Sequence, residues 1–398
     1  MRILMVNKFL YPKGGVETYV LKLGRLLKEK GHQIEYFGMQ DERNIVGNKA
    51  GSYVSNIDFQ KKDVKKLTAP FRIIYSKEAR KKIRKVLDEF QPQVVHFNNI
   101  QFHLTPSMIL EVEKYRKETG DDVRIVYTTH DYQLICPSHG LFDTQVRICE
   151  KCLSGNYFHC VLTKCVKNSR AKSLLGMLDA YWWKYSKAYS YIDRIICPSF
   201  FMKGKMDTQE RFREKTVVIH NFVDEVEERI VEKDNYILEF GHLSKDKGTN
   251  TLLKVCERMP EEQFVFAGYG EAVKEIESIP NAHYVGFKTG EELELLIRKA
   301  KISVCPSECY ENCPFAVIES QMYLTPVIGS RRGGIPELIQ EGETGELFEA
   351  GDDKDLERAI RKVLKDENTL HWYTENCKKL QIVTPDSYYQ QLVRIYQN

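Results

Sequence analysis

The chain has 398 residues, of which 42% are hydrophobic and 29% charged, and its formal net charge is only +3. This length exceeds what one compact core usually organises, so it predicts two domains and excludes a single small binding module. The near balance of charges argues against a general nucleic-acid binder, and we expect no nucleic-acid partner. No stretch reaches the roughly 18 consecutive apolar residues of a membrane span, and the first apolar run is too short for a signal peptide. The sequence therefore predicts a cytoplasmic protein.

The first half of the chain alternates short apolar runs with helical patterns, which is typical of parallel sheets covered by helices. The first run, 2–7, is followed by a loop with Gly14 and Gly15, and then by apolar residues at helical spacing as far as Gly31. Further buried strands are predicted at 32–38, 92–97, 123–129 and 194–198.

The second half begins after an acidic stretch at 224–234 and repeats the same alternation. Strands are predicted at 236–241, 264–268, 283–286, 302–306 and 325–329, and a last helix at 386–396. We therefore expect an N-terminal Rossmann-like domain over 1–205, a C-terminal one over 215–383, and a C-terminal helix within 384–398 that packs back on the N-terminal domain. Domains of this kind bind ligands at the carboxyl ends of their strands, so the loops there are the informative ones.

Two loops that contain glycine have the composition of phosphate-binding sites. Gly14 and Gly15 open the N-terminus of the first helix to an anion, although a turn that merely needs glycine explains them too. The spacing G-x-G-x-x-G is absent, which argues against an oxidoreductase that uses a nicotinamide cofactor. In the second half, Lys247 stands beside Gly248 after a strand, where its ammonium group can reach phosphate oxygens; a solvated loop is the alternative.

The strongest signal is a pair of glutamates, Glu311 and Glu319, which follow the predicted strand at 302–306 and flank Pro314. If a helix begins at Pro314, a favourable first position, Glu311 lies in the loop before it and Glu319 lies inside its first turns. The two carboxylates can then address different parts of one ligand. A glycine-rich loop at 333–337 follows the next strand.

Taken in order, these segments resemble glycosyltransferase family 4, whose members are retaining, nucleotide-sugar-dependent enzymes of the GT-B fold. The resemblance covers nearly the whole chain and implies an α/β protein with two Rossmann-like doubly wound domains that face a central cleft. It also implies a hexosyltransferase that moves a sugar from a nucleotide-diphosphate sugar, such as a UDP-sugar, to a cell-surface glycan or a lipid-linked precursor in polysaccharide biosynthesis. The motifs that carry it are Gly14–Gly15 with Glu17, 94–96, His130–Asp131, 221–224, 246–248, 268–271, 311–319 and 333–337.

The resemblance also implies roles for individual residues. Glu319 would bind the ribose hydroxyls, Glu311 the hydroxyls of the donor sugar, and Lys247 the diphosphate. His130 would lie beside the transferred sugar, and the backbone near Phe287 would meet the base. The implied catalytic residues are thus Glu311, His130 and Lys247. The other implied donor contacts are His242 and the backbone at Gly14, Gly15, Pro314, Phe315 and Ala316.

One position departs from the family pattern. Members commonly have an arginine directly after the glycine of the phosphate loop, and this chain has His242, which would offer a weaker and pH-dependent charge. Lys245 could compensate for it. The departure keeps a second hypothesis open, a non-catalytic relative that binds nucleotide sugars without transferring them. The family also implies that catalysis requires no metal or other cofactor.

Five cysteines lie within thirty residues of the first half and form a Cys-rich insertion near 136–165. The spacing Cys149-x-x-Cys152 suits a tetrahedral zinc ion, for which His139 and His159 are substitute ligands. Unliganded thiols are the alternative, and a redox role is a third. The candidate ligands of a structural zinc are Cys136, Cys149, Cys152, Cys160 and Cys165.

The segment 60–85 contains eleven lysine or arginine residues against two acidic ones. Apolar residues are interleaved with these charges, a composition that suits an anionic membrane surface. A solvated helix face is the alternative. With the membrane hypothesis, we expect a cytoplasmic protein that is peripheral at the inner membrane face.

Overall fold

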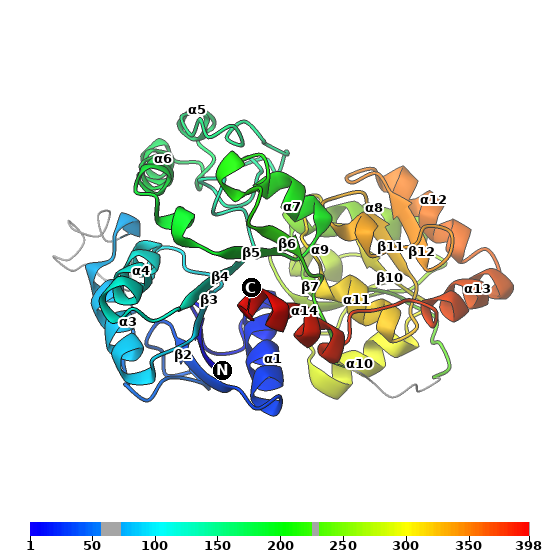
Figure 1. The fold of residues 1–398 in the computed structure, drawn as a ribbon. Coiled ribbons are helices and arrows are strands. Elements are labelled where there is room, and N and C mark those ends of the chain that lie inside the picture. Colours follow the sequence, from blue (N-terminus) through cyan, green and yellow to red (C-terminus); the bar gives the residue numbers. More distant parts are fainter. Residues whose placement is uncertain (57–72, 225–230, 398) are drawn as a thin grey trace. The chain divides into compact units, whose positions relative to one another are not determined.

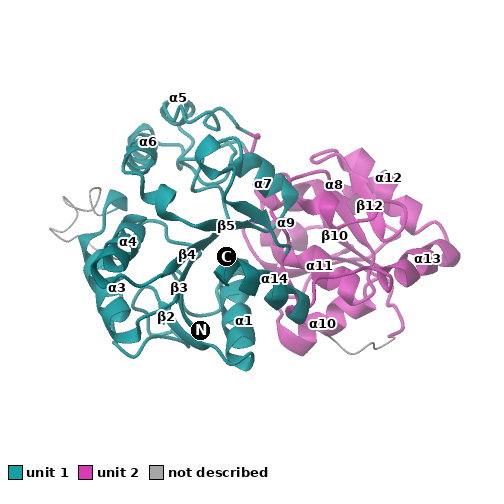
Figure 2. Cartoon of the chain, in the orientation of Figure 1, with its two compact units in different colours: residues 1–145, 149–220, 386–398 teal, residues 146–148, 221–385 magenta. Residues whose placement is uncertain are grey.

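The structure is a computed structural model that describes residues 1–56, 73–224 and 231–397 (Figure 1). The chain forms two compact units, one of residues 1–145, 149–220 and 386–398 and the other of residues 146–148 and 221–385 (Figure 2). Each unit contains one six-stranded sheet whose strands pair in parallel. The predicted fold class, an α/β protein with two doubly wound domains, is therefore confirmed. Part of the basic segment, 60–72, lies outside the described residues.

In unit 1 the sheet has the strand order β2-β1-β3-β4-β5-β6. The chain adds β2 on one side of β1 and then returns to add β3 on the other side, so the winding reverses between β1 and β3. Ligands of doubly wound sheets bind at such a reversal, beyond the carboxyl ends of the strands. The strands are Arg2–Val6 (β1), Gln33–Phe37 (β2), Val94–Phe97 (β3), Arg124–Thr128 (β4), Arg194–Cys197 (β5) and Thr216–Val218 (β6).

Helices cover this sheet, and the last one reaches it from the far end of the chain. The helix α14, which the sequence predicts at 386–396, follows unit 2 but belongs with unit 1 from Asp386 onward. The hydroxyl groups of Tyr388 and Tyr19 lie 2.6 Å apart, which ties α14 to α1. The helices of unit 1 are Gly15–Glu29 (α1), Lys77–Phe90 (α3), Ser107–Thr119 (α4), His159–Thr163 (α5), Arg170–Tyr185 (α6), Phe200–Met206 (α7) and Pro385–Gln397 (α14), with short 3-10 helices at Ala188–Tyr191 (η2) and Glu210–Phe212 (η3).

In unit 2 the sheet has the strand order β12-β11-β10-β7-β8-β9. Read from β9, this is the third, second, first, fourth, fifth and sixth strand of the unit, the order found in dinucleotide-binding domains. The winding reverses between β7 and β10, and both strands are followed by loops that the sequence singled out. The strands are Ile237–His242 (β7), Phe264–Tyr269 (β8), Ala282–Tyr284 (β9), Ile302–Cys305 (β10), Val327–Ser330 (β11) and Gly345–Phe348 (β12).

One buried cluster of unit 2 lies between the sheet and the helices α8 and α12. Leu252 of α8 and Ile360 of α12 pack in one buried cluster with Phe264, Phe266 and Phe348 of the strands. Burying such side chains is the main favourable contribution to folding. The helices of unit 2 are Thr249–Arg258 (α8), Val273–Glu277 (α9), Gly290–Lys299 (α10), Phe315–Met322 (α11), Asp353–Val363 (α12) and Glu367–Cys377 (α13), with 3-10 helices at Lys245–Lys247 (η4) and Ile335–Glu337 (η5).

The units differ in two ways from the sequence prediction. Residues 206–220, predicted as linker and as the start of the second domain, belong to unit 1 and include β6. The sequence did not predict β12 as a strand. With three and four residues respectively, β6 and β12 are too short to show a period of their own, and pairing with β5 and β11 defines them.

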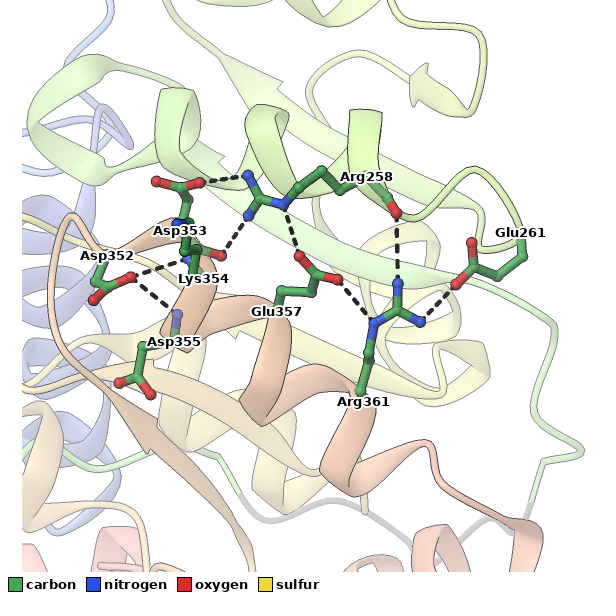
Figure 3. Close-up of polar contacts among 8 residues, drawn as sticks. All are labelled: Arg258, Glu261, Asp352, Asp353, Lys354, Asp355, Glu357 and Arg361. Atoms are coloured by element: carbon green, nitrogen blue, oxygen red, sulfur yellow. Dashed lines mark hydrogen bonds and ion pairs between the residues drawn. The ribbon is translucent and has the colours of Figure 1, made fainter.

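An ion-pair network joins α8 to α12 at the surface of unit 2 (Figure 3). The carboxylate of Glu357 accepts hydrogen bonds from Arg258 at 2.6 Å and from Arg361 at 2.9 Å. Arg258 also donates to the backbone oxygen of Asp353 at 2.7 Å, and Arg361 donates to Glu261 at 2.7 Å. Glu357 thus connects two arginines from different helices.

Replacing Glu357 with glutamine should lower the free energy of unfolding by about 1 kcal/mol at low salt, since both arginines lose their shared negative partner. Urea unfolding followed by circular dichroism at 20 mM and 1 M NaCl measures this. Salt screens surface charges, so the difference from the unsubstituted protein should shrink at 1 M. The control is Glu343→Gln, an exposed glutamate outside the network. Equal destabilisation by both substitutions would contradict a specific role for Glu357.

Candidate functional site

The loops that follow β7 and β10 bring a lysine and a glutamate together at the reversal point of the unit 2 sheet. The Nζ atom of Lys247, at the end of η4, lies 2.6 Å from Oε1 of Glu311 in the loop after β10. The hydroxyl of Ser307 donates a hydrogen bond of 2.9 Å to the same oxygen. The Lys247 side chain is 33% exposed and that of Glu311 is 17% exposed, so solvent still reaches the pair. The pair lies where doubly wound domains bind their ligands.

The neighbours of Lys247 keep its side chain protonated. Burial by itself lowers the pKa of Lys247, but the neighbouring Glu311 carboxylate, with smaller contributions from Cys309 and Asp246, outweighs burial and raises the pKa above its ordinary value. Lys247 is therefore an ammonium ion throughout the neutral pH range. The site contains a permanent positive charge that a phosphate group can use.

Two glycines allow the loops to approach this closely. Gly248 has a φ of +77°, and a Cβ atom there would lie 1.9 Å from the backbone oxygen of Pro306. Gly333 has a φ of +60°, and its Cβ would lie 1.9 Å from the backbone oxygen of Glu311. The same oxygen accepts a hydrogen bond of 2.7 Å from the Gly334 amide. The glycine-rich loop after β11 thus positions the backbone of Glu311, because only glycine fits at such contacts.

The helix α11 begins one residue later than predicted, with Pro314 in an extended conformation just before it. Glu319 lies in its second turn and is half-buried. The side chain of Asn221 donates a hydrogen bond of 2.9 Å to the backbone oxygen of Cys313, which fixes the turn that precedes the helix. The N-terminus of α11 at Phe315 carries a partial positive charge, as helix N-termini do. The cysteines of this region, Cys305, Cys309 and Cys313, carry free thiols.

Three rings lie at the carboxyl ends of neighbouring strands, since His242 ends β7, Tyr269 ends β8 and Phe287 follows β9. The ring centroid of Tyr269 lies 5.2 Å from that of His242 and 5.7 Å from that of Phe287. The exposed fraction is 47% for Tyr269 and 63% for Phe287. Nδ1 of His242 is hydrogen-bonded to the Ser244 hydroxyl at 3.1 Å. The sequence indicated His242 and Phe287 but gave no role to Tyr269, although the motif at 268–271 contains it.

In unit 1, His130 follows β4 and is hydrogen-bonded through Nε2 to the side-chain oxygen of Asn98, 3.0 Å away. Burial lowers the pKa of His130 to about 3, so its ring is neutral at physiological pH. A neutral imidazole whose Nε2 carries the hydrogen donates to Asn98. His130 can therefore act through hydrogen bonds, and its charge does not change near pH 7.

The surroundings of His130 depend on α14. The ring of Tyr19 lies 4.9 Å from the ring of His130, and its hydroxyl contacts the hydroxyls of Tyr388 at 2.6 Å and Thr128 at 3.3 Å. The Tyr396 hydroxyl lies 2.6 Å from Nδ1 of His96, whose Nε2 lies 2.7 Å from the Thr128 hydroxyl. The sequence analysis missed these tyrosines, since nothing in their local pattern indicates what α14 contacts.

The loop with Gly14 and Gly15 differs from the expectation of a helix N-terminus open to an anion. The carboxylate of Glu17, in the first turn of α1, is buried and lies next to Gly14. The side chain of Asn7 donates a hydrogen bond of 3.4 Å to it. Burial raises the pKa of Glu17 above its ordinary value. A carboxylate of the protein itself thus takes part of the space near the helix start, and donor binding at Gly14 and Gly15 stays a prediction.

The five cysteines of the insertion carry free thiols, and Cys136, Cys152 and Cys160 are buried. The sulfur atoms of Cys160 and Cys165 lie 2.7 Å apart. Within residues 1–56, 73–224 and 231–397, no three His, Cys, Asp or Glu side chains are arranged to hold a metal ion. The structural zinc stays a prediction, which metal analysis of the purified protein would test.

A buried glutamate lies in the strand that leads to the site. Oε1 of Glu239 in β7 accepts a hydrogen bond of 2.8 Å from the Thr249 hydroxyl, whereas Oε2 has no hydrogen-bond partner among the described residues. Burial raises the pKa of Glu239 to about 8. The folded protein therefore binds a proton here much more tightly than the unfolded chain does.

Two doubly wound units, one with a cation and a carboxylate at its reversal point, define a two-domain α/β protein suited to binding a phosphorylated ligand. A family model described as "Glycosyltransferase Family 4" matches residues 13–227, and one described as "Glycosyl transferases group 1" matches residues 222–380. The chain belongs to glycosyltransferase family 4, as its motifs predicted.

Curated relatives match part of the chain. A sulfoquinovosyl transferase of Arabidopsis thaliana is 32% identical over 139 residues, which are 33% of this chain and 27% of that protein. An uncharacterised glycosyltransferase of Methanocaldococcus jannaschii is 29% identical over 206 residues, which are 50% of this chain and 57% of that protein. In both cases the matched region is less than two thirds of the relative's length.

Solved structures match the whole chain at low identity. A sucrose-phosphate synthase of Thermosynechococcus elongatus has a TM-score of 0.70 and 15% identity, with coverage of 100% of this chain and 98% of that one. HepE of Anabaena, in complex with UDP, has a TM-score of 0.67 and 15% identity, with coverage of 99% of each chain. At this identity the likeness shows the fold alone. No helix in the described part of the chain is long and apolar enough to cross a membrane.

Replacing Glu239 with glutamine should stabilise the protein in alkaline solution. The pKa of Glu239 is raised on folding, so its contribution to stability declines as pH rises from about 4.5 to about 8 and is least favourable above that. The neutral glutamine keeps an acceptor for Thr249 and avoids this decline. Urea unfolding should show a gain on the order of 3 kcal/mol at pH 9 and little gain at pH 5. A gain that does not depend on pH would contradict the assignment.

Proposed function

We propose that the protein is a retaining glycosyltransferase that transfers a hexose from a nucleotide-diphosphate sugar. The observation that carries the proposal is the contact between Lys247 and Glu311 at the reversal point of the unit 2 sheet. Family membership supports the same reaction class. The alternative, a relative that binds nucleotide sugars without transferring them, becomes an outcome of the tests below.

The first part of the proposed mechanism concerns the leaving group. Breaking the bond to the sugar leaves a nucleoside diphosphate, whose developing negative charge must be stabilised. Lys247 offers a permanent positive charge for this, and the N-terminus of α11 at Phe315 offers partial charge from its backbone amides. These groups take the part that a divalent ion plays in other transferases, so we propose that catalysis needs no metal.

The second part concerns the sugar. Glu311 would accept hydrogen bonds from hydroxyl groups of the donor sugar, and Ser307 and Lys247 already fix one of its oxygens. The carboxylate is thus oriented before the donor binds, which lowers the cost of ordering it. Glu319 in α11 would bind the ribose hydroxyls. His130, neutral and held by Asn98, would contribute a hydrogen-bonding ring beside the transferred sugar.

The third part concerns the base. Tyr269 and Phe287 are exposed next to His242, and aromatic surfaces of this kind stack on nucleobases. A structural relative, HepE, was solved in complexes with UDP and with UDP-glucose, which supports a UDP-sugar as the donor. We propose that Tyr269 belongs to the base-binding surface together with the backbone near Phe287.

The acceptor in this proposal is a cell-surface glycan or a lipid-linked precursor. Two further relatives, an amylovoran biosynthesis glycosyltransferase of Erwinia amylovora and a putative colanic acid biosynthesis glycosyltransferase of Escherichia coli, have names that support polysaccharide biosynthesis.

Binding of UDP, GDP and ADP can be compared by thermal unfolding of the chelator-treated protein. A ligand at about a hundred times its dissociation constant stabilises by roughly 2.7 kcal/mol, which raises the midpoint by several degrees. We expect a shift with one nucleoside diphosphate, UDP, in the absence of metal, and none with NADH. No shift with any diphosphate would contradict the proposed site.

Turnover of the donor separates an enzyme from a non-catalytic relative. Lys247→Met should lower kcat/KM by about 10²–10³ because the leaving group loses its charge partner. Glu311→Gln should abolish transfer while nucleotide binding is largely kept, and Glu319→Gln should weaken donor binding itself. The matched control is Lys254→Met, an exposed lysine on α8. Full activity in both glutamate variants would overturn the site assignment.

A further inference from the structure

The exposed face of α6, the helix that follows the Cys-rich insertion, is apolar rather than polar. Its exposed large side chains are spaced by four, four and three residues, which places them on one side of the helix. Helices at a protein surface normally direct charged and polar residues outward, so an apolar outward face indicates an interaction. These residues are Leu174, Leu178, Trp182 and Tyr185, with exposed fractions between 45% and 71%.

The neighbouring helix α5 also exposes large apolar side chains. Phe158, which precedes α5, and Leu162 within it are 53% and 64% exposed. Beneath both helices lies a buried cluster of Cys152, Tyr157 and Cys160, against which Met177 of α6 packs. Other side chains of α5 and α6 thus cover this buried cluster, and the exposed residues are not needed for that purpose. We call the exposed set, residues 158, 162, 174, 178, 182 and 185, the α5–α6 surface.

The charges around the α5–α6 surface are almost all positive. Residues 158–187 contain six lysines and arginines and one acidic residue, Asp179. The carboxylate of Asp179 accepts a hydrogen bond of 2.9 Å from the Trp183 ring and is largely buried, so the exposed charge is basic. The exposed basic residues are Lys167, Arg170, Lys172 and Lys187.

A contact joins this surface to the basic segment that the sequence analysis singled out. The ring of Tyr75 stacks on Trp183 with centroids 6.0 Å apart and meets the edge of Trp182 at 6.4 Å. Tyr75 leads directly into α3, whose exposed lysines include Lys77 and Lys81. Two separate stretches of basic residues are therefore connected next to the exposed tryptophan.

We propose that the α5–α6 surface binds the interface of an anionic phospholipid bilayer, with its leucines and Trp182 among the lipid chains and its lysines and arginines at the headgroups. Amphipathic helices of this composition lie in the plane of the interface. Tryptophan and tyrosine favour the headgroup level, and basic residues are attracted to anionic lipids. The inference does not depend on the sugar chemistry, since its test measures binding alone.

Co-sedimentation with vesicles tests the proposal. The full chain should bind vesicles of phosphatidylcholine and phosphatidylglycerol (3:1) at low salt, and should bind pure phosphatidylcholine at least about tenfold more weakly. The double substitution Leu174→Gln, Leu178→Gln should lower binding to the anionic vesicles about tenfold, because it removes apolar surface from the contact. The matched control is Leu295→Gln on α10, where the leucine is 49% exposed. Equal binding by the double variant, the control and the unsubstituted protein would overturn the proposal.

Tryptophan fluorescence gives a second readout that a folding defect would not imitate. The chain has three tryptophans, and Trp372→Phe leaves buried Trp183 and exposed Trp182. On addition of anionic vesicles, emission of this variant should shift to shorter wavelength and become quenched by brominated lipid. Absence of both changes would contradict insertion of Trp182.

A second copy of the chain is the competing occupant of the α5–α6 surface. Light scattering across a range of protein concentrations distinguishes it from a membrane. A monomer that binds vesicles supports the proposal. A dimer that is lost in the Leu174→Gln, Leu178→Gln variant, together with no vesicle binding, overturns it.

Discussion

The ion pair between Lys247 and Glu311 is the contact on which the candidate site of unit 2 depends. It forms because the winding of the sheet reverses between β7 and β10, so the loops after these strands, distant in sequence, meet at one edge. Gly248 and Gly333 allow the backbones to come within reach of each other. A lysine and a carboxylate at this position give the unit a fixed cation, which is the property that a diphosphate ligand requires.

Unit 1 differs from unit 2 at its candidate residue, because His130 is neutral and is held by hydrogen bonds. Tyr19, Thr128 and His96 form a buried polar network with tyrosines of α14. Buried polar groups are costly unless they are paired, so such a network fixes side-chain positions closely. The two units thus offer complementary chemistry, a permanent charge in one and an oriented neutral ring in the other.

The sequence predicted the features that short segments encode. Strand positions, the loops at their carboxyl ends and the two glutamates followed from apolar runs, glycines and Pro314. Tyr388 was not predicted, because its importance comes from Tyr19, a partner far away in the chain. The same reason explains β6, which is defined by pairing with β5, and Glu17, whose carboxylate lies beside Gly14 only in the folded structure. These features are therefore defined by tertiary contacts, which local sequence patterns do not encode.

The membership of α14 in unit 1 has a consequence for how the protein is made. Unit 2 is inserted in the sequence between β6 and α14, so a ribosome completes unit 2 before it supplies the last helix of unit 1. Until α14 emerges, Tyr19 lacks the Tyr388 hydroxyl and His96 lacks that of Tyr396. The surroundings of His130 are thus completed only after unit 2 has been synthesised, and a chain interrupted before α14 contains the strands of both sheets but lacks these contacts.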